Sequence, residues 1–287
     1  MDHGHEIVGA LKAASLEIYD HVKSGEGLKV LKSANASGDD QIGLDMFADG
    51  AFRQRLSEVA SVSRVVSEEG DDMDKLREAP YSVALDPIDG SKAALVGIPC
   101  GAIFAIFEGV EAIGDFAGKN LVSSGFFVFG INLEMYISAE KGVSQYVYDD
   151  ASSTWELKQT FETLHDKSSL SVNASGRPHW HDSLKDVFDD FCESGGNQRW
   201  FASMVADVKR LLIEGGLFIY PGNKKPGYEN GHLRLIYEAI PMAFLMQKMG
   251  GAESDGTRSL LDIAPSELHQ KIPVFLGTKD LVAKFTA

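Results

Sequence analysis

The stretch VALDPIDGSKAAL, residues 83–95, places two aspartates three positions apart at the end of an apolar run. Asp86 and Asp89 repel each other at that spacing unless a positive charge lies between them. Lys92 is the first basic residue that follows them. We therefore expect either a turn that is fully exposed to water or a cation bound at the end of a buried strand.

Further acidic residues lie at the ends of neighbouring predicted elements. The segment GDDQIGLD contains Asp39 and Asp45, and VVSEEG contains Glu68 and Glu69. Glu68, like Asp86, directly follows an apolar β-run, and α/β proteins place ligands at such sheet ends. A single acid of this kind is usually an exposed surface residue, so the prediction rests on the whole set.

The chemistry of this set indicates a metal and a phosphate. Carboxylate oxygens are the ligands that suit Mg²⁺ or Mn²⁺. Gly90 and Ser91 supply backbone N–H groups that can approach a phosphate at the start of a helix. Carboxylates beside such a turn are typical of metal-assisted hydrolysis of phosphate esters. That reaction needs a barrier reduction on the order of 20 kcal/mol, which one solvated aspartate cannot supply.

The overall composition argues against several other classes of protein. The 287 residues carry 42 acidic and 27 basic side chains, and the formal net charge of −15 disfavours a nucleic-acid partner or an anionic membrane surface. Cys100 and Cys192 are far apart and form no C-x-x-C motif, so we expect a reducing, cytoplasmic location. The sequence shows no signal peptide and no apolar run of about 20 residues, so we expect no membrane segment.

Apolar periodicity predicts an α/β fold (α+β type), with a mixed sheet and helices in the first part and an α/β layer in the second. Helices are expected at 6–24, 41–59, 183–193, 204–214 and 234–250. Strands are expected at 63–67, 81–85, 101–107, 124–131, 134–138, 217–220 and 273–278, with a hairpin over 145–160. The pattern changes near residue 167, so we predict lobes at 1–166 and 167–287 that share an interface.

With these segments in view, the chain resembles the fructose-1,6-bisphosphatase and sedoheptulose-1,7-bisphosphatase family of lithium-sensitive, Mg²⁺-dependent sugar phosphatases. GDDQIGLD, VVSEEG and ALDPIDGS resemble its three N-terminal metal motifs. The segments 199–225 and 233–256 resemble its C-terminal substrate and metal segments. The resemblance implies an αβαβα layered fold, a metal-binding first lobe, a sugar-phosphate-binding second lobe, and hydrolysis of the 1-phosphate of a ketose bisphosphate with two or three Mg²⁺ or Mn²⁺ ions per site.

The resemblance also assigns roles to individual residues. The implied metal ligands are Glu68, Asp86, Asp89, Glu238 and the carbonyl group of Ile88. The implied catalytic residues are Glu69 and Asp45, which would activate water, and Asp39, which would assist a third metal and the leaving group. The implied substrate-binding residues are Gly90 and Ser91 for the reacting phosphate, Ser203 and Met204 for the sugar, and Asn173, Arg199, Tyr220 and His232 for the distal phosphate. The family takes that arginine from a neighbouring subunit, which implies a homodimer or homotetramer.

Several positions depart from the family pattern. Lys92 and Ala93 replace a Ser-Asn pair after DGS, which puts a cation beside the phosphate site. Gly176 and Trp200 stand where the distal site has tyrosines, and His232 stands where it has a lysine. Lys224, Lys225 and Arg177 are the candidates to compensate, and the sequence does not separate them. The AMP-binding segment and the redox cysteines of regulated relatives have no counterpart, so we expect neither AMP nor a dithiol to control activity.

Two choices remain open at this point. GDDQIGLDMFAD and the altered distal site favour sedoheptulose 1,7-bisphosphate by a small margin, whereas the C-terminal block is closer to the fructose branch. An inositol or nucleotide phosphatase of the same superfamily is disfavoured by the retained Arg199 and Tyr220, because a monophosphate needs no second phosphate site. A non-catalytic sugar-phosphate sensor is supported only by Lys92 and Ala93. The pathway within carbohydrate metabolism (Calvin cycle, pentose phosphate or gluconeogenesis) is equally open.

Overall fold

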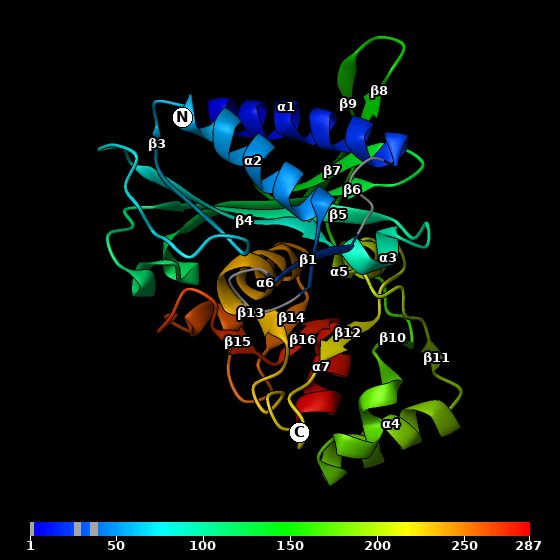
Figure 1. Cartoon of the computed structure of the whole chain (residues 1–287). Coiled ribbons are helices and arrows are strands. Elements are labelled where there is room, and N and C mark those ends of the chain that lie inside the picture. The colour runs from blue at the N-terminus through cyan, green and yellow to red at the C-terminus, as the bar shows by residue number, and fades with distance from the viewer. Residues whose placement is uncertain (1–2, 26–29, 35–39) are drawn as a thin grey trace.

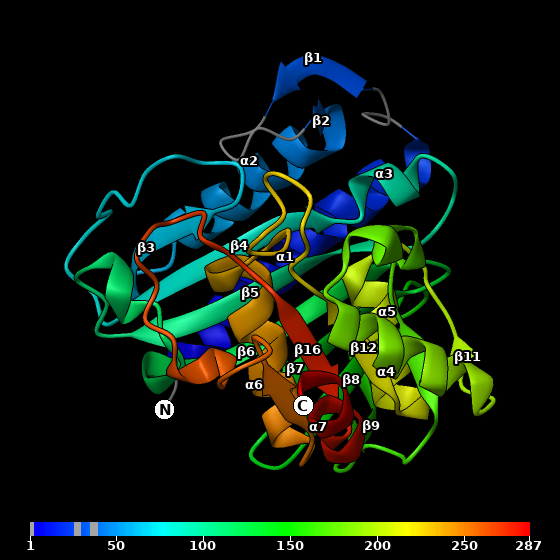
Figure 2. The ribbon, with the colours of Figure 1, turned by 90° about the horizontal axis from the view of Figure 1, so that it is seen from below.

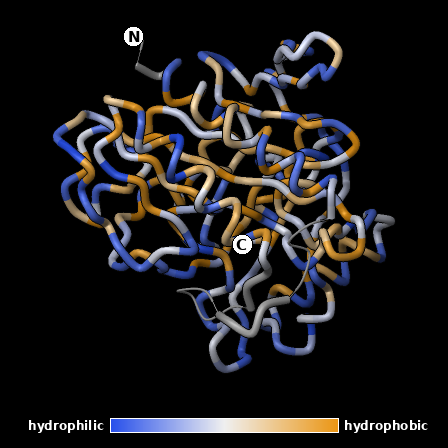
Figure 3. The backbone as a smooth tube through the Cα atoms, turned by 45° about the horizontal axis from the view of Figure 1, so that its top comes forward, coloured by the Kyte–Doolittle hydropathy of each residue, from blue (hydrophilic) through white to orange (hydrophobic). Residues whose placement is uncertain are grey.

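The computed structural model describes residues 3–25, 30–34 and 40–287, and these residues form five stacked layers (Figure 1). The order is two helices, a seven-stranded sheet, two helices, a five-stranded sheet and two helices. The predicted fold class and the αβαβα arrangement are confirmed. Apolar segments run through the strands and inner helices, and polar segments lie mainly at the periphery (Figure 3).

The seven-stranded sheet is the centre of the first half of the chain, and only its first strand pair is parallel. Its strands in spatial order are β3 (Val62–Ser67), β4 (Tyr81–Asp89), β5 (Cys100–Glu108), β6 (Leu121–Phe129), β7 (Leu133–Ser138), β8 (Val143–Asp149) and β9 (Thr154–Phe161). Helices cover both faces, so β4 and β5 are buried along nearly their whole length. A strand buried on both faces reads as a continuous apolar run, and this explains the GAIFAIF segment.

The outer face of this sheet is covered by α1 (His3–Ser24) and α2 (Gly43–Ser57). Ile7, Leu11 and Ile18 of α1 are fully buried against α2 and the sheet. Their spacing of three to four residues, or multiples of it, places them on one helical face, as predicted. The predicted helices 6–24 and 41–59 are thus confirmed with shifted ends.

The inner face of the sheet packs on α5 (Met204–Glu214) and α6 (Ile240–Lys248). The predicted helix 204–214 is confirmed. The predicted helix 234–250 differs at its start, because Leu235–Ala239 forms a π-helical turn before α6. A π-turn widens the helix by one residue per turn and is frequent at functional sites.

The second sheet lies beneath α5 and α6 and is mixed. Its strands in spatial order are β11 (Asn197–Gln198), β10 (Ser169–Ser171), β12 (Leu217–Tyr220), β16 (Val274–Gly277) and β14 (Ala252–Ser254). Its other face is covered by α4 (Asp182–Glu193) and α7 (Lys279–Thr286), which lie at the bottom of Figure 1 and toward the viewer in Figure 2.

The remaining elements are short. They are β1 (Val30–Ala34), β2 (Asp40–Ile42), α3 (Ser91–Ala94), β13 (Leu233–Arg234), β15 (Lys271–Ile272) and 3₁₀ turns at Ile113–Asp115, Gly118–Asn120, Ala174–His179 and Leu260–Asp262. None of the helices described is both long and apolar enough to span a bilayer.

Candidate active site

A cavity of about 340 Å³ lies between the end of β4 and the elements of the second half of the chain. It brings together all but two of the predicted site residues. Those that line it are Asp45, Glu68, Glu69, Asp86, Ile88, Asp89, Gly90, Ser91, Asn173, Ser203, Met204, Tyr220, His232 and Glu238. Arg199 does not line it, and Asp39 lies outside the described residues.

The carboxylates of Asp86, Asp89 and Glu238 form a tight cluster in this cavity. One oxygen from each of them lies within 4.8 Å of the others. Their residues are only 3%, 9% and 3% exposed. The exposed-turn reading of the DPID segment is therefore wrong.

An irregularity in β4 brings the two aspartates to the same face of the sheet. In a regular strand, residues three positions apart point to opposite faces. Asp86 pairs with Ile103 of β5, but Asp89 pairs with Gly101, so β4 contains one extra residue between the two pairs. Such a bulge restores both side chains to one face. The strand thus continues to Asp89, four residues beyond the predicted end at residue 85.

Asp89 is tied to the start of α5, and this contact joins the two halves of the site. Its Oδ2 accepts hydrogen bonds from the Ser203 hydroxyl at 3.0 Å and from the Val205 backbone N–H at 2.9 Å. Gly90 has a φ of +78°, and a Cβ added there would lie 2.7 Å from the Ser203 Cβ. Only glycine therefore allows this close approach without a shift of Ser203.

Arg234 is the one basic residue buried among these acids in the part of the chain that is described. Its Nη2 lies 3.0 Å from Glu68 Oε1, and its backbone N–H donates to Glu238 Oε2 at 2.6 Å. Arg234 is 4% exposed. The sequence did not predict this burial, because only its place in the Leu-Arg-Leu segment marked this arginine. It therefore orients two of the carboxylates.

The charge balance of the cavity fits a divalent cation. Burial raises the pKa of Asp86 well above its usual range, and Glu68, Glu238 and Asp89 raise it further, while Arg234 opposes them. Burial also raises the pKa of Asp89, against the hydrogen bonds from Val205, Met204 and Ser203. One guanidinium does not neutralise four buried carboxylates, and hard oxygen donors in this arrangement suit Mg²⁺ or Mn²⁺.

Comparison with known proteins gives the chain a family. The model of the fructose-1,6-bisphosphatase N-terminal domain matches residues 6–160, and that of the C-terminal domain matches residues 163–287. The chain belongs to the fructose-1,6-bisphosphatase family.

Individual relatives within the fructose-1,6-bisphosphatase family cover nearly the whole chain. The class 1 fructose-1,6-bisphosphatase of Rhodopseudomonas palustris (strain TIE-1) is 34% identical over 96% of this chain and 85% of that protein. A class 1 enzyme of Cereibacter sphaeroides (strain ATCC 17029) is 34% identical over 98% of this chain and 89% of its own length. The crystal structure of Leishmania major fructose-1,6-bisphosphatase in holo form superposes with a TM-score of 0.93 at 25% identity, over 99% of this chain and 94% of that one.

The distal end of the cavity is lined by the ring side chains of Trp200, Tyr220 and His232. The Trp200 ring lies 6.1 Å from that of Tyr220, and Tyr220 stacks on His232 at 5.8 Å. Arg199 is exposed, and its Nη1 donates to the Gln198 carbonyl at 2.8 Å. It does not line this cavity.

Asp207 of α5 binds the backbone of the loop before this helix, at Phe201. Its burial makes the stability of the protein depend on pH. It is fully buried and accepts a hydrogen bond from the Phe201 N–H at 3.2 Å. Burial raises the pKa of Asp207 to about 7. Between pH 4 and 7 the folded state therefore keeps a proton that the unfolded state releases, so ionisation lowers the free energy of unfolding as pH rises.

We expect the Asp207→Asn variant to lose this part of the pH dependence. Asparagine keeps an oxygen for the Phe201 N–H but carries no charge. Relative to the wild type, the variant should gain up to about 4 kcal/mol in the free energy of unfolding between pH 4 and pH 7.5, since one pKa unit corresponds to about 1.4 kcal/mol. Urea unfolding at both pH values measures the difference. Parallel pH profiles in the two proteins would contradict it.

Proposed function

We propose that this chain hydrolyses the 1-phosphate of a ketose bisphosphate in a reaction that depends on Mg²⁺, with Mn²⁺ as a substitute. As a member of the fructose-1,6-bisphosphatase family, it is a phosphoric monoester hydrolase of the sugar-bisphosphatase class. The observation that carries the proposal is the buried group of Asp86, Asp89 and Glu238 in a cavity that also contains Gly90 and Ser91.

The metal would be held by Asp86, Asp89 and Glu238, with Glu68 and the Ile88 carbonyl at the margin of the group. Two or three bound ions would neutralise phosphoryl oxygens and lower the pKa of water. Arg234 keeps Glu68 and Glu238 in place through the contacts described above. Ser203 and Val205 do the same for Asp89.

The protein's own groups would carry out the proton transfer and the positioning. Glu69 is partly exposed at the end of β3, and Asp45 is buried in the first turn of α2; both line the cavity. We assign to Glu69 the uptake of the proton from the attacking water, with Asp45 supporting it, and to Asp39 assistance to the leaving group. Gly90 and Ser91 would bind the reacting phosphate.

The sugar and its second phosphate would extend toward the second sheet. Ser203 and Met204 lie beside the metal cluster and would contact the sugar hydroxyls. Asn173, Tyr220 and His232 would bind the distal phosphate. Arg199 of a neighbouring subunit would join them, which implies a homodimer or homotetramer. We further infer a cytoplasmic protein with functional lobes at 1–166 and 167–287.

The names of these relatives, all fructose-1,6-bisphosphatases, support fructose 1,6-bisphosphate as a substrate. Sedoheptulose 1,7-bisphosphate is the second candidate, because the distal site is altered, with Gly176 at a position where the resemblance places a tyrosine. The two sugars differ by one carbon in the chain that separates the two phosphates. Their relative kcat/KM therefore reports how far the distal phosphate lies from the metal cluster.

Phosphate release from both bisphosphates, with Mg²⁺ and with EDTA, tests the proposal. We expect Mg²⁺-dependent release of one phosphate per sugar and none in EDTA. Inositol 1-phosphate and a nucleotide 3′-phosphate serve as control substrates for the neighbouring phosphatase classes. If the protein hydrolyses either control substrate faster than both bisphosphates, it belongs to that phosphatase class by activity and the proposed function is wrong. Binding of the bisphosphates without turnover would indicate a sensor.

A further inference from the structure

A second cavity of about 270 Å³ continues the active-site cavity on the side away from the metal cluster. Asn173 and Tyr220 line both cavities, so the two meet at these side chains. Gly176 lines the second cavity beside Trp180, and a Cβ added at Gly176 would lie 3.1 Å from the Trp180 Nε1 atom. Hereafter we call this second space the side cavity.

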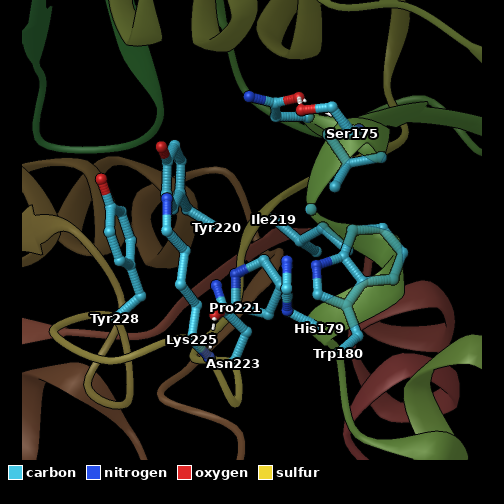
Figure 4. Close-up of a pocket in the computed structure, with 12 residues that line it drawn as sticks. Ser175, His179, Trp180, Ile219, Tyr220, Pro221, Asn223, Lys225 and Tyr228 are labelled. Carbon is cyan, nitrogen blue, oxygen red and sulfur yellow. Dashed lines mark hydrogen bonds between the residues drawn. The ribbon is translucent and has the colours of Figure 1, made fainter.

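Lys225 is the cation of the side cavity. Its side chain extends past the Tyr228 ring toward Tyr220 (Figure 4). The Nζ atom lies 4.6 Å from the centre of the Tyr228 ring. The Tyr228 ring stacks on His232 at 5.7 Å, and His232 stacks on Tyr220 at 5.8 Å. A continuous row of rings thus connects the active-site cavity to the Lys225 ammonium group.

The two alternative cations are paired with acids of α4. Arg177 binds Asp189 through two hydrogen bonds, of which the Nε–Oδ1 bond measures 2.9 Å. Lys224 lies 3.6 Å from Asp182. Neither residue lines the side cavity. The Lys225 ammonium forms no ion pair with any residue in the described ranges.

The loop that carries Lys225 has a defined backbone. The Lys225 N–H donates to Asn223 Oδ1 at 2.9 Å, and the Tyr228 N–H donates to the Lys225 carbonyl at 3.0 Å. The Lys224 N–H donates to the His179 carbonyl at 2.8 Å, which joins the loop to the turn that contains Gly176. The backbone at Lys225 is therefore fixed relative to the wall of the side cavity.

Asn173 presents a second donor at the junction of the two cavities. Its Oδ1 accepts hydrogen bonds from the Ser175 N–H at 3.2 Å and from the Ser175 hydroxyl at 2.6 Å. The carbonyl end of the side chain is thus occupied, so its NH₂ group is left to donate. An ammonium, an amide NH₂ and a tyrosine hydroxyl around one space are the donors that a phosphate dianion requires.

We propose that the side cavity binds the phosphate that is not hydrolysed, and that Lys225 is its cationic contact from the same subunit. This inference rests on the proposed function. In a chain with a net charge of −15, a dianion needs such a local cation. Lys225 thereby supplies a lysine ammonium at the distal phosphate, where the resemblance places a lysine at the position of His232.

The test compares Lys225→Met with Lys224→Met. Methionine keeps most of the length of the side chain and removes the charge, and Lys224 is the adjacent lysine outside the cavity. For the preferred bisphosphate we expect Lys225→Met to lower kcat/KM about 10- to 100-fold, mainly through KM, as the loss of one charged hydrogen bond implies. Lys224→Met should stay within about twofold of the wild type.

A substrate without the distal phosphate separates this contact from a general defect. For fructose 1-phosphate we expect Lys225→Met and the wild type to have equal kcat/KM. A Lys225→Arg variant should restore most of the bisphosphate activity. Equal kcat/KM of Lys225→Met and wild type for the bisphosphate, or an equal loss with fructose 1-phosphate, would overturn the inference.

Calorimetric titration with fructose 6-phosphate tests the contact without turnover. This sugar carries the distal phosphate but lacks the 1-phosphate that the proposed reaction removes. We expect the wild type and Lys224→Met to bind it alike and Lys225→Met to bind it at least tenfold more weakly. If the wild type hydrolyses no bisphosphate, the proposed function fails. The titration still shows whether the side cavity binds a sugar phosphate through Lys225. Equal affinity in all three proteins, or no binding by the wild type, would contradict the assignment of Lys225.

Discussion

Replacement of Glu69 by glutamine is expected to lower kcat by about 10²- to 10⁴-fold and to leave KM nearly unchanged. Glutamine has the size and the hydrogen-bonding oxygen of glutamate, but its neutral amide does not accept a proton from water. Loss of a positioned general base costs a factor of this size. Glu69 lies at the rim of the cavity rather than among the clustered carboxylates, so metal binding should persist.

Steady-state kinetics at saturating Mg²⁺ measure this effect, and calorimetry gives the affinity for the bisphosphate. Glu108→Gln is the matched control, because Glu108 is exposed at the far end of β5. The control should retain the wild-type kcat. If Glu69→Gln retains kcat within threefold, another group takes the proton. A change in KM alone would make Glu69 a binding residue.

Replacement of Asp86 by asparagine is expected to abolish turnover and, at the same time, to stabilise the metal-free protein. Burial and the acids Glu68, Glu238 and Asp89 raise the pKa of Asp86. Above the usual pKa of an aspartate, the folded state therefore holds a proton that the unfolded state has lost, and unfolding becomes more favourable as pH rises. Asparagine removes this cost, and it also removes one of the three clustered carboxylates that would hold a cation.

Thermal unfolding in EDTA and in Mg²⁺ at pH 7.5 distinguishes the two effects. In EDTA we expect Asp86→Asn to melt above the wild type by at least about 2–4 °C, the shift that 1 kcal/mol gives in large domains. Mg²⁺ should raise the Tm of the wild type and leave that of the variant unchanged. Asp190→Asn, on the exposed side of α4, should behave like the wild type. A lower Tm of Asp86→Asn in EDTA would show that protein groups, not a cation, hold this carboxylate.

The sequence predicted the layers well because their apolar patterns are strong. The GAIFAIF run is buried in β5, and the helix over 204–214 matches α5 at both ends. Short edge elements were missed. β14 (Ala252–Ser254) has no apolar pattern of its own and becomes a strand only through its pairing with β16. Such pairing depends on residues distant in the sequence, which local propensity does not encode.

The candidate site could be predicted only in part from the sequence. Spacing pointed to Asp86 and Asp89, but the bulge that gives them a common face arises from pairing with β5. Arg234 was missed as a site residue, because its burial follows from the packing of the π-turn against β4 and β5. Three cations near the distal end were equivalent in the sequence, and only their partners in the fold separate them. The roles of Glu69, Asp45 and Asp39 stay predictions.

The residues of the carboxylate cluster are synthesised at different times. Asp89 and Glu238 are separated by 149 positions (238 − 89). A ribosome that adds roughly 5–20 residues per second needs about 7–30 s to pass from the first to the second. Until the end of that interval the nascent chain contains Glu68, Asp86 and Asp89 but not Glu238, and Ser203 and Arg234 are added only in its later part. The group of Asp86, Asp89 and Glu238 is therefore complete only when more than four-fifths of the chain has been synthesised, and a chain released earlier lacks one of the three proposed metal ligands.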